Sequence, residues 1–231
     1  MADVASTTTV PPSTTTTVAW PASCTRIPEE IAGPNGADGE YGTSVLDRAG
    51  IVRRDVRSNI DGTRARADGV ALQVRVRVVD TAAGCRPIAG AAVYLWSPDA
   101  YGRYSVFDPA LDGATYLRGV QVTDADGFAV FDGIVPGTYP GRWPHFHFEV
   151  YPSAAAATTY RNKIATSDLA VPEDVCRAAF AAMDYGPSLR NMVNTPMSDD
   201  PSFTDDTAGL QRLAVAGSVA AGYVGTVTVG V

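Results

Sequence analysis

The stretch GIVPGTYPGRWPHFHFEVY, residues Gly133–Tyr151, carries most of the information about fold and function in this chain. It holds His145 and His147, the only two histidines among 231 residues. Side chains two residues apart on a β-strand point to the same face of a sheet. The two imidazoles would therefore lie side by side, which favours a pair of metal ligands over two histidines in a polar hydrogen-bonded cluster.

The residues around the histidines fit a strand with one apolar face. Phe146, Phe148 and Val150 alternate with the imidazoles and would pack against a core. The preceding VPGTYPGRWP contains three prolines and two glycines, which restrict the backbone. This turn would hold Tyr139 and Arg142 near the start of the strand, so that a phenol lies beside two imidazoles.

Length and composition limit the classes of protein to which the chain can belong. With 231 residues and 45% hydrophobic content, it has enough apolar side chains for one large domain or two small ones. The net charge of -7 argues against nucleic acid or an anionic membrane as a partner. No apolar run reaches about eighteen residues, so no membrane-spanning helix is predicted.

The first 23 residues, MADVASTTTVPPSTTTTVAWPAS, differ in composition from the rest. They are rich in Thr, Ser and Pro and cannot bury a core, so residues 1–23 are expected to form a disordered linker or tail. They lack the basic start and apolar run of an intact signal peptide. Because such stalks are most common outside the cell, an extracellular domain over residues 24–231 is expected; a bland tail on a cytosolic protein is the alternative.

Three cysteines, Cys24, Cys85 and Cys176, lie far apart and form no C-x-x-C motif, which argues against a zinc ribbon. In a secreted domain they predict one disulfide and one free thiol, with the pairing left open. Three reduced, packed thiols are the alternative.

Short alternating segments dominate the body of the chain. Val70–Val78 (VALQVRVRV) alternates apolar and polar residues and predicts a half-buried strand. The DADG sequence at Asp124–Gly127 is typical of a hairpin turn. The other predicted elements are strands over Ala91–Ser97, Leu117–Thr123, Phe128–Phe131 and Tyr223–Val231, and a helix over Pro172–Met183. Together they predict an all-β fold, mainly an antiparallel β-sandwich with one or two short helices and long loops.

Two segments resemble the core of the intradiol ring-cleavage dioxygenases. They are GAAVYLWSPDAYGRYS, residues Gly90–Ser105, and YLRGVQVTDADGFAVFDGIVPGTYPGRWPHFHFEV, residues Tyr116–Val150. The resemblance is strong over these segments and weaker across the rest of the chain from Cys24 onward. Members of the family are non-haem iron(III) enzymes that use O₂ to open catechol-type rings between the two hydroxyl groups.

The family binds its metal through two tyrosines and two histidines, and each ligand has a counterpart here. The first tyrosine lies in a G-R-Y segment that matches Tyr104, and the second lies in P-G-x-Y-P, which matches Tyr139. The family's H-x-H matches His145 and His147, and its active-site arginine, three residues earlier, matches Arg142. The resemblance therefore implies one Fe(3+) ion held by these four ligands, with the arginine acting beside it.

Ferric iron suits such a ligand set, because anionic phenolate oxygen stabilises it and imidazole binds iron well. A bound cation can deprotonate a phenol whose free pKa is about 10. In the family, the tyrosine matched by Tyr139 leaves the iron when substrate binds and accepts a proton, and the arginine stabilises charge on the ring. The implied partners are a catechol-type substrate and O₂, and the implied product is a cis,cis-muconate-type diacid.

Two further residues are weaker candidates for contact with substrate. Tyr101 lies in the same loop as Tyr104, and Arg118 precedes a glycine ahead of a strand. The alternatives are packing for Tyr101 and a surface ion pair for Arg118. Glu149 shares the histidine face, where a hydrogen bond to a ligand imidazole and plain solvation are equally open.

The chain departs from the best-known catechol and protocatechuate enzymes in ways that leave substrate choice and oligomeric state open. Only five residues separate Tyr139 from His145, and no long N-terminal helical dimerisation segment is present. In these respects it is similar to compact, secreted actinobacterial members. A different class of protein, the non-enzymatic cell-surface β-sandwich spacers and adhesin modules, shares part of the pattern but has an ordinary apolar strand where this chain has its two histidines.

Overall fold

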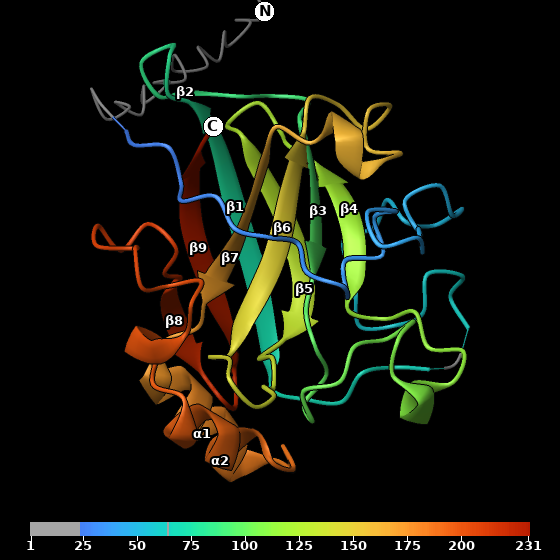
Figure 1. Cartoon of the computed structure of the whole chain (residues 1–231), viewed down its shortest axis with the longest axis vertical. Coiled ribbons are helices and arrows are strands. Elements are labelled where there is room, and N and C mark those ends of the chain that lie inside the picture. The colour runs from blue at the N-terminus through green and yellow to red at the C-terminus, as the bar shows by residue number, and fades with distance from the viewer. Residues whose placement is uncertain (1–23, 64) are drawn as a thin grey trace, which may run out of the picture.

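The computed structural model describes residues 24–63 and 65–231, and its regular secondary structure consists of two β-sheets and two short helices joined by long loops (Figure 1). The Thr-, Ser- and Pro-rich segment 1–23, predicted to be a linker or tail, lies outside the described residues. None of the helices in the described ranges is long and apolar enough to cross a membrane.

The first sheet lies around the longest strand, β1. Its strands are β1 (Ala71–Asp80), β2 (Arg86–Pro87), β5 (Phe128–Ile134), β8 (Ala214–Ser218) and β9 (Gly222–Gly230). The second sheet has the order β4-β3-β6-β7, with bounds Arg118–Val122 for β4, Ala92–Trp96 for β3, His145–Tyr151 for β6 and Ala165–Ala170 for β7. The helices are α1 (Glu173–Ala182), α2 (Ser188–Asn194) and the 3-10 turns Pro109–Leu111, Tyr160–Asn162 and Met197–Asp199.

Strand direction is antiparallel at all but one of the pairings between these strands. β1 pairs in parallel with β9, and antiparallel with β2 and β5. In the second sheet β6 lies between β3 and β7 and is antiparallel to both. The prediction of a β-rich, mainly antiparallel fold with few helices is therefore confirmed.

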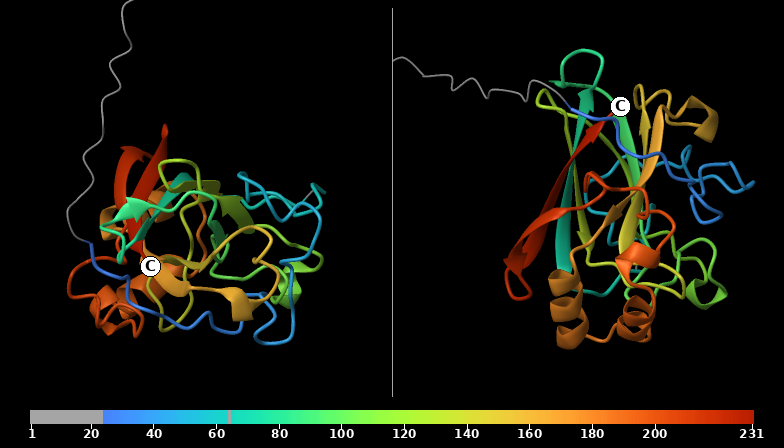
Figure 2. Two further views of the ribbon diagram at one scale, coloured as in Figure 1. Left: turned by 90° about the horizontal axis from the view of Figure 1, so that it is seen from above. Right: turned by 60° about the vertical axis from the view of Figure 1, so that its left-hand side comes forward.

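The main hydrophobic core lies between the two sheets, which face each other in the right-hand view of Figure 2. Leu72, Val74, Val76 and Val78 of β1 point into it, as the alternation of that strand predicts. From the opposite sheet, β6 contributes the side chains of its apolar face, which are Phe146, Phe148 and Val150. The histidines of β6 therefore face away from this core.

A second, smaller core covers the outer face of β6 and β3. Tyr94, Trp96 and Tyr151 of the sheet pack there against loop residues from the N-terminal part of the chain, including Val45 and Leu46. The segment that supplies these loop residues crosses the outside of the second sheet in Figure 1. The histidine face is consequently buried under loops rather than open to water.

The predicted hairpin at Asp124–Gly127 is wrong. The tight turn is present, since Asp124 Oδ1 accepts hydrogen bonds from the backbone N–H groups of Asp126 and Phe128. However, β4 pairs with β3 and β5 pairs with β1, so the two strands enter different sheets. DADG dictates a local reversal of the chain, but the partners of the two strands are set by burial on opposite sides of the core.

The other predicted elements agree with the structure to within a few residues at their ends. The helix predicted over Pro172–Met183 is α1, with Pro172 at its N-cap position. Four elements were not predicted: the edge strands β2 and β8, and also α2 and β7. Of these, α2 and β7 lie in the stretch after the H-x-H strand, where sequence regularity is low. The omission of α2 and β7 concerns the functional site.

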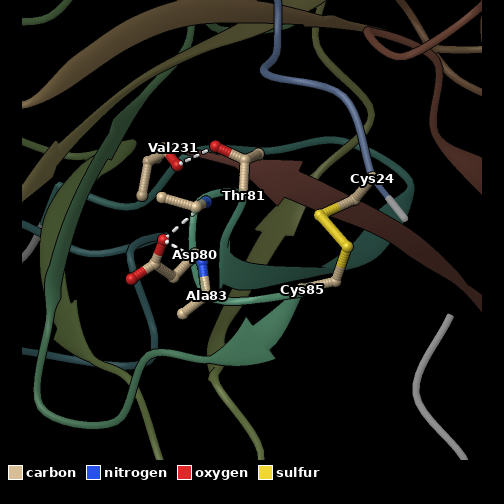
Figure 3. The surroundings of a disulfide bond; sticks show 7 residues. Cys24, Asp80, Thr81, Ala83, Cys85 and Val231 are labelled. Atoms are coloured by element: carbon tan, nitrogen blue, oxygen red, sulfur yellow. Dashed lines mark hydrogen bonds between the residues drawn. A yellow bond between two sulfur atoms is a disulfide. The ribbon is translucent and has the colours of Figure 1, made fainter. Parts of the chain in front are cut away.

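A disulfide joins Cys24 to Cys85 (Figure 3). Cys176 is a free, buried thiol in α1. The bond links the start of the described chain to the turn after β1. Nearby, the backbone N–H and the side-chain hydroxyl of Thr81 both donate hydrogen bonds to the main-chain oxygen of Val231. The two ends of the domain are thus attached to the same corner of the first sheet.

Candidate metal centre

Both histidines sit at the beginning of β6, in the middle of the second sheet. In the strand register, His147 lies opposite Trp96 of β3 and Asp168 of β7. The Trp96 ring stacks on the imidazole of His147, with centroids 5.0 Å apart and an interplanar angle of 13°. Both imidazoles are buried, so their orientation is fixed by packing and by the polar groups around them.

The Nε2 atoms of the two histidines point toward each other and lie 3.0 Å apart. His145 Nδ1 donates a hydrogen bond to the carbonyl oxygen of Trp143. This bond places the ring proton on Nδ1 and leaves Nε2 with a free lone pair, the usual arrangement for a metal-binding imidazole. Burial, together with the charge of Arg142, lowers the pKa of His145 well below its ordinary value, which keeps the ring neutral.

The two predicted tyrosine ligands converge on the same point. Tyr104 Oη lies 2.9 Å from His147 Nε2. The ring of Tyr139 is 5.7 Å from that of Tyr104 and 6.2 Å from that of His145, measured between centroids. The structure therefore brings together all four residues, although Tyr104 lies outside the stretch Gly133–Tyr151 that holds the other three.

Two glycines allow the tyrosine-bearing loops to pack this closely. Gly102 has a φ of +81°, and a Cβ atom there would collide with the backbone of Thr138. A Cβ atom at Gly137 would collide with the carbonyl oxygen of Ala100. Ser188 Oγ of α2 accepts a hydrogen bond from the backbone N–H of Thr138, at 2.9 Å, and donates one to the carbonyl oxygen of Ala100, at 2.8 Å, which ties the two loops together. The unpredicted helix α2 thus fixes the distance between Tyr104 and Tyr139.

Burial and the neighbouring Tyr139 raise the pKa of Tyr104 well above the ordinary value for a phenol. Without a cation, Tyr104 is therefore a neutral phenol. A bound metal ion reverses this preference, because it can deprotonate a coordinating phenol outright.

Arg142 lies beside the four residues and is held by two carboxylates that are completely buried. Its Nε is 3.0 Å from each carboxylate oxygen of Asp200, and one Nη is 2.7 Å from Asp168. The other Nη points toward Tyr139, at 3.4 Å from Oη. The guanidinium thus has a fixed position next to the Tyr139 hydroxyl. Tyr139 is the residue that the resemblance predicts to leave the iron when substrate binds.

Asp168 and Asp200 are the residues that sequence reasoning missed. Asp168 contacts Nδ1 of His147 with one carboxylate oxygen and Arg142 with the other. Asp200 also accepts a hydrogen bond from the backbone N–H of Trp143, at 2.6 Å. Both aspartates lie in stretches that showed no strand or helix pattern. Asp168 is a single charge among small and apolar residues in ATSDLA, whereas Asp200 is one of several acidic residues in the polar loop TPMSDDPSFTDD.

The donor atoms fit a ferric ion better than a site made from the histidines and Asp168. His145, His147 and Asp168 do offer three possible ligand atoms within 4.8 Å of one another. However, Asp168 lies at Nδ1 of His147, behind the ring, whereas Nε2 faces Tyr104 and His145. Two phenolic oxygens and two imidazole nitrogens are a suitable set for iron(III). Tyr104, Tyr139, His145 and His147 are therefore the residues that would hold it.

A cavity of about 320 Å³ opens beside the two tyrosines. It is lined by Asn35, Gly102, Arg103, Tyr104, Phe107, Asp108, Pro109 and Tyr139. The lining combines aromatic rings with a few polar groups, which is typical of a site for a small organic molecule.

The two weaker substrate-binding candidates do not line this cavity. Tyr101 is 38% exposed and donates a hydrogen bond to Asp184, at the edge of a different, smaller cavity. Arg118 is completely buried, and its guanidinium donates to the carbonyl oxygens of Asn35 and Ser105. It is therefore not in a surface ion pair, and it supports the cavity wall from behind.

Glu149, on the same face of β6, belongs to a separate buried cluster. Its carboxylate accepts hydrogen bonds from Tyr151 Oη at 2.6 Å and Lys163 Nζ at 3.0 Å. Glu149 is therefore neither solvated nor hydrogen-bonded to one of the histidines, so both sequence-based alternatives are wrong.

Comparisons with known proteins agree with this geometry. A family model described as "Dioxygenase" matches residues 47–150, which include all four proposed ligands. An intradiol ring-cleavage dioxygenase from Tetranychus urticae has a similar structure, with a TM-score of 0.67 and 25% identity over 90% of this chain and 94% of that chain. No curated protein sequence matches the chain at a significant level.

Two bacterial structures share the fold at lower identity. The dioxygenase domain of a dioxygenase carbohydrate-binding protein fusion from Streptomyces sp. SirexAA-E has a TM-score of 0.57 and 21% identity, over 90% of this chain and 98% of that chain. A 3-chlorocatechol 1,2-dioxygenase from Rhodococcus opacus has a TM-score of 0.51 and 18% identity, over 82% of this chain and 69% of that chain. These two structures show that the fold is shared, while the matched family region and the similarity to the Tetranychus urticae enzyme identify the chain as a dioxygenase of the intradiol ring-cleavage type.

Proposed function

We propose that this protein is an iron(III)-dependent intradiol dioxygenase that cleaves catechol-type rings with O₂ and yields cis,cis-muconate-type diacids. The observation that carries the proposal is the convergence of Tyr104, Tyr139, His145 and His147, with Tyr104 Oη and His145 Nε2 at 2.9 and 3.0 Å from His147 Nε2. In the family to which the chain belongs, residues at these motif positions are the ligands of the catalytic iron. When bound, the metal supplies Lewis-acid and redox chemistry that side chains lack.

The side chains around the metal have distinct roles in this proposal. Tyr139 accepts a proton from the incoming substrate, for which its position at the rim of the cavity is suitable. Arg142 keeps a positive charge next to Tyr139 Oη, where it stabilises negative charge that develops on the ring. The two carboxylates that hold Arg142 prevent the guanidinium from turning away.

The cavity beside the tyrosines is the proposed binding site for the aromatic ring. Phe107 offers an apolar surface, while Asn35 and Asp108 offer polar groups at the edge. Because three of the eight lining residues are aromatic and the cavity is about 320 Å³, a single catechol-type ring is the expected ligand.

An extracellular location is part of the proposal. The Cys24–Cys85 disulfide supports it, because such bonds persist in oxidising compartments and are rare in the cytosol. The Thr-rich composition of residues 1–23 is consistent with a stalk outside the cell.

The test is to purify the full chain, reconstitute it with iron and measure metal content, the visible spectrum and oxygen uptake. Catechol, protocatechuate, hydroxyquinol and caffeate serve as substrates. The expected results are one iron per chain, a red band from tyrosinate-to-iron charge transfer, and a product that contains both atoms of ¹⁸O₂. A colourless protein that binds zinc stoichiometrically, or none of the metals, would instead favour a spacer or adhesin module.

A further inference from the structure

Asp168 occupies a position between the proposed metal site and the catalytic arginine. It lies on β7, directly opposite His147 of β6 in the strand register. One carboxylate oxygen contacts His147 Nδ1, and the other accepts a hydrogen bond from Arg142 at 2.7 Å. A single side chain therefore contacts both groups.

The contact with His147 is exclusive. Within the described part of the chain, neither His147 Nδ1 nor the facing oxygen of Asp168 has another hydrogen-bond partner. Both atoms are buried, and an unpaired buried polar atom is costly. The pair is therefore expected to share a proton carried by Nδ1, which leaves Nε2 directed at Tyr104 and His145.

The charges around Arg142 do not balance within the protein. Asp168 and Asp200 are both completely buried, and the single guanidinium of Arg142 lies between them. Two buried carboxylates and one guanidinium leave one excess negative charge, which is expensive unless a cation lies nearby.

We propose that Asp168 is a positioning residue that fixes the His147 imidazole for iron binding and Arg142 for catalysis in one shared geometry. The inference rests on the proposed iron site. It goes further because it gives the Asp168 carboxylate two roles at that site. The carboxylate orients the His147 imidazole, and it supplies part of the negative charge that favours iron(III) over iron(II). Mutation of a carboxylate that is hydrogen-bonded to a metal-binding imidazole typically weakens metal affinity by about 10- to 100-fold.

Three variants separate this role from a general structural one. Asp168→Asn keeps an oxygen that can accept the Nδ1 proton but removes the charge, whereas Asp168→Ala removes both. Ser202→Ala is the matched control, because Ser202 Oγ contacts the same Nη atom of Arg142, at 3.0 Å, but not His147. Apo-protein melting curves establish that each variant is folded.

The first measurements are ferric affinity, by competition with a chelator, and the iron reduction potential. Asp168→Ala should weaken binding by about 10- to 100-fold. Asp168→Asn should weaken it less and shift the potential to a more positive value, since a negative charge has been removed. Ser202→Ala should stay within about twofold of the wild-type affinity with an unchanged potential. Unchanged affinity and potential in both Asp168 variants would overturn the proposal.

A second measurement needs no variant. The chain has only two histidines, so ¹⁵N-histidine labelling gives spectra of two rings. With diamagnetic gallium(III) in place of iron, both rings should carry their proton on Nδ1 and none on Nε2. A proton on Nε2 of His147 would overturn the role of Asp168 even if the metal binds. Wild-type protein that takes up neither metal would overturn the proposed function and this inference together, whereas metal uptake with insensitive variants overturns the inference alone.

Discussion

Tyr104 Oη lies 2.9 Å from His147 Nε2, although the two residues are 43 positions apart and belong to different structural units, a loop and a strand. The loop is held in place by glycine packing and by Ser188 of α2, and the strand by its two neighbours in the sheet. The site thus depends on a rigid sheet for its nitrogen donors and on a supported loop for its oxygen donors.

Tyr104→Phe is expected to abolish the red colour or the bound iron, because it removes a phenolate that remains a ligand throughout the proposed reaction. Tyr101→Phe is the control, since Tyr101 is directed at Asp184 and lies outside the cavity. Metal analysis and visible spectra after identical reconstitution compare the two. Full iron content and colour in Tyr104→Phe would remove this residue from the ligand set.

Tyr139→Phe should retain some iron yet bind catechol slowly, because one proton acceptor is missing. Stopped-flow absorbance with a catechol measures the rate of complex formation. Binding at the wild-type rate would show that Tyr139 does not accept a substrate proton.

Arg142→Ala is expected to lower turnover by about 10²–10³, as is typical when a preorganised charge is removed. It should also destabilise the protein by about 3–5 kcal/mol, because Asp168 and Asp200 lose their buried partner. Chemical denaturation and single-turnover kinetics measure the two effects separately. Arg142→Lys, which keeps the charge, should recover more stability than activity because lysine cannot make the same fork of hydrogen bonds.

The disulfide should contribute about 4 kcal/mol to stability through the 61-residue separation that it spans. Replacing both Cys24 and Cys85 with serine should therefore lower the denaturation midpoint markedly, and Cys176→Ala serves as a control that leaves the bond intact. Mass spectrometry without reduction should find one disulfide and one free thiol. Three free thiols in the native protein would contradict both the bond and the proposed extracellular location.

Glu149 should make stability depend on pH. Burial, and then the neighbouring Asp38, raise its pKa from 4.5 to about 7. Because the folded pKa exceeds the unfolded one, the protonated carboxyl group stabilises the fold below about pH 4.5, and this contribution is lost as the pH rises to about 7. Glu149→Gln should thus gain up to about 3 kcal/mol relative to wild type across that range. Denaturation curves from pH 4 to 8 test this, and equal pH profiles for the two proteins would contradict it.

The sequence predicts the parts of the site that rest on local patterns. Alternation around His145 and His147 correctly gives a strand with one face in the core, because the period of a strand is set by its backbone. The motifs around Tyr104 and Tyr139 correctly indicate residues that meet in space. These features are encoded within a few residues of one another.

The sequence does not predict the partners of these residues, because those depend on contacts between distant segments. Asp168 becomes important only through the pairing of β7 with β6, and nothing in ATSDLA signals that pairing. The turn at Asp124–Gly127 likewise specifies a reversal without specifying which sheet each strand joins. Long-range pairing of this kind is decided by how the whole chain buries its apolar faces.

The attachment of Val231 to the first sheet has a practical consequence. Val231 is hydrogen-bonded to Thr81 and to the backbone of Val79, at the end of the sheets where β6 finishes in Figure 1. His145 and His147 lie in the first half of β6, toward the other end. An electrode or resin attached at this end of the sheets would hold the protein with the tyrosine-lined cavity turned toward the solution, so that small aromatic molecules could reach it without crossing the support.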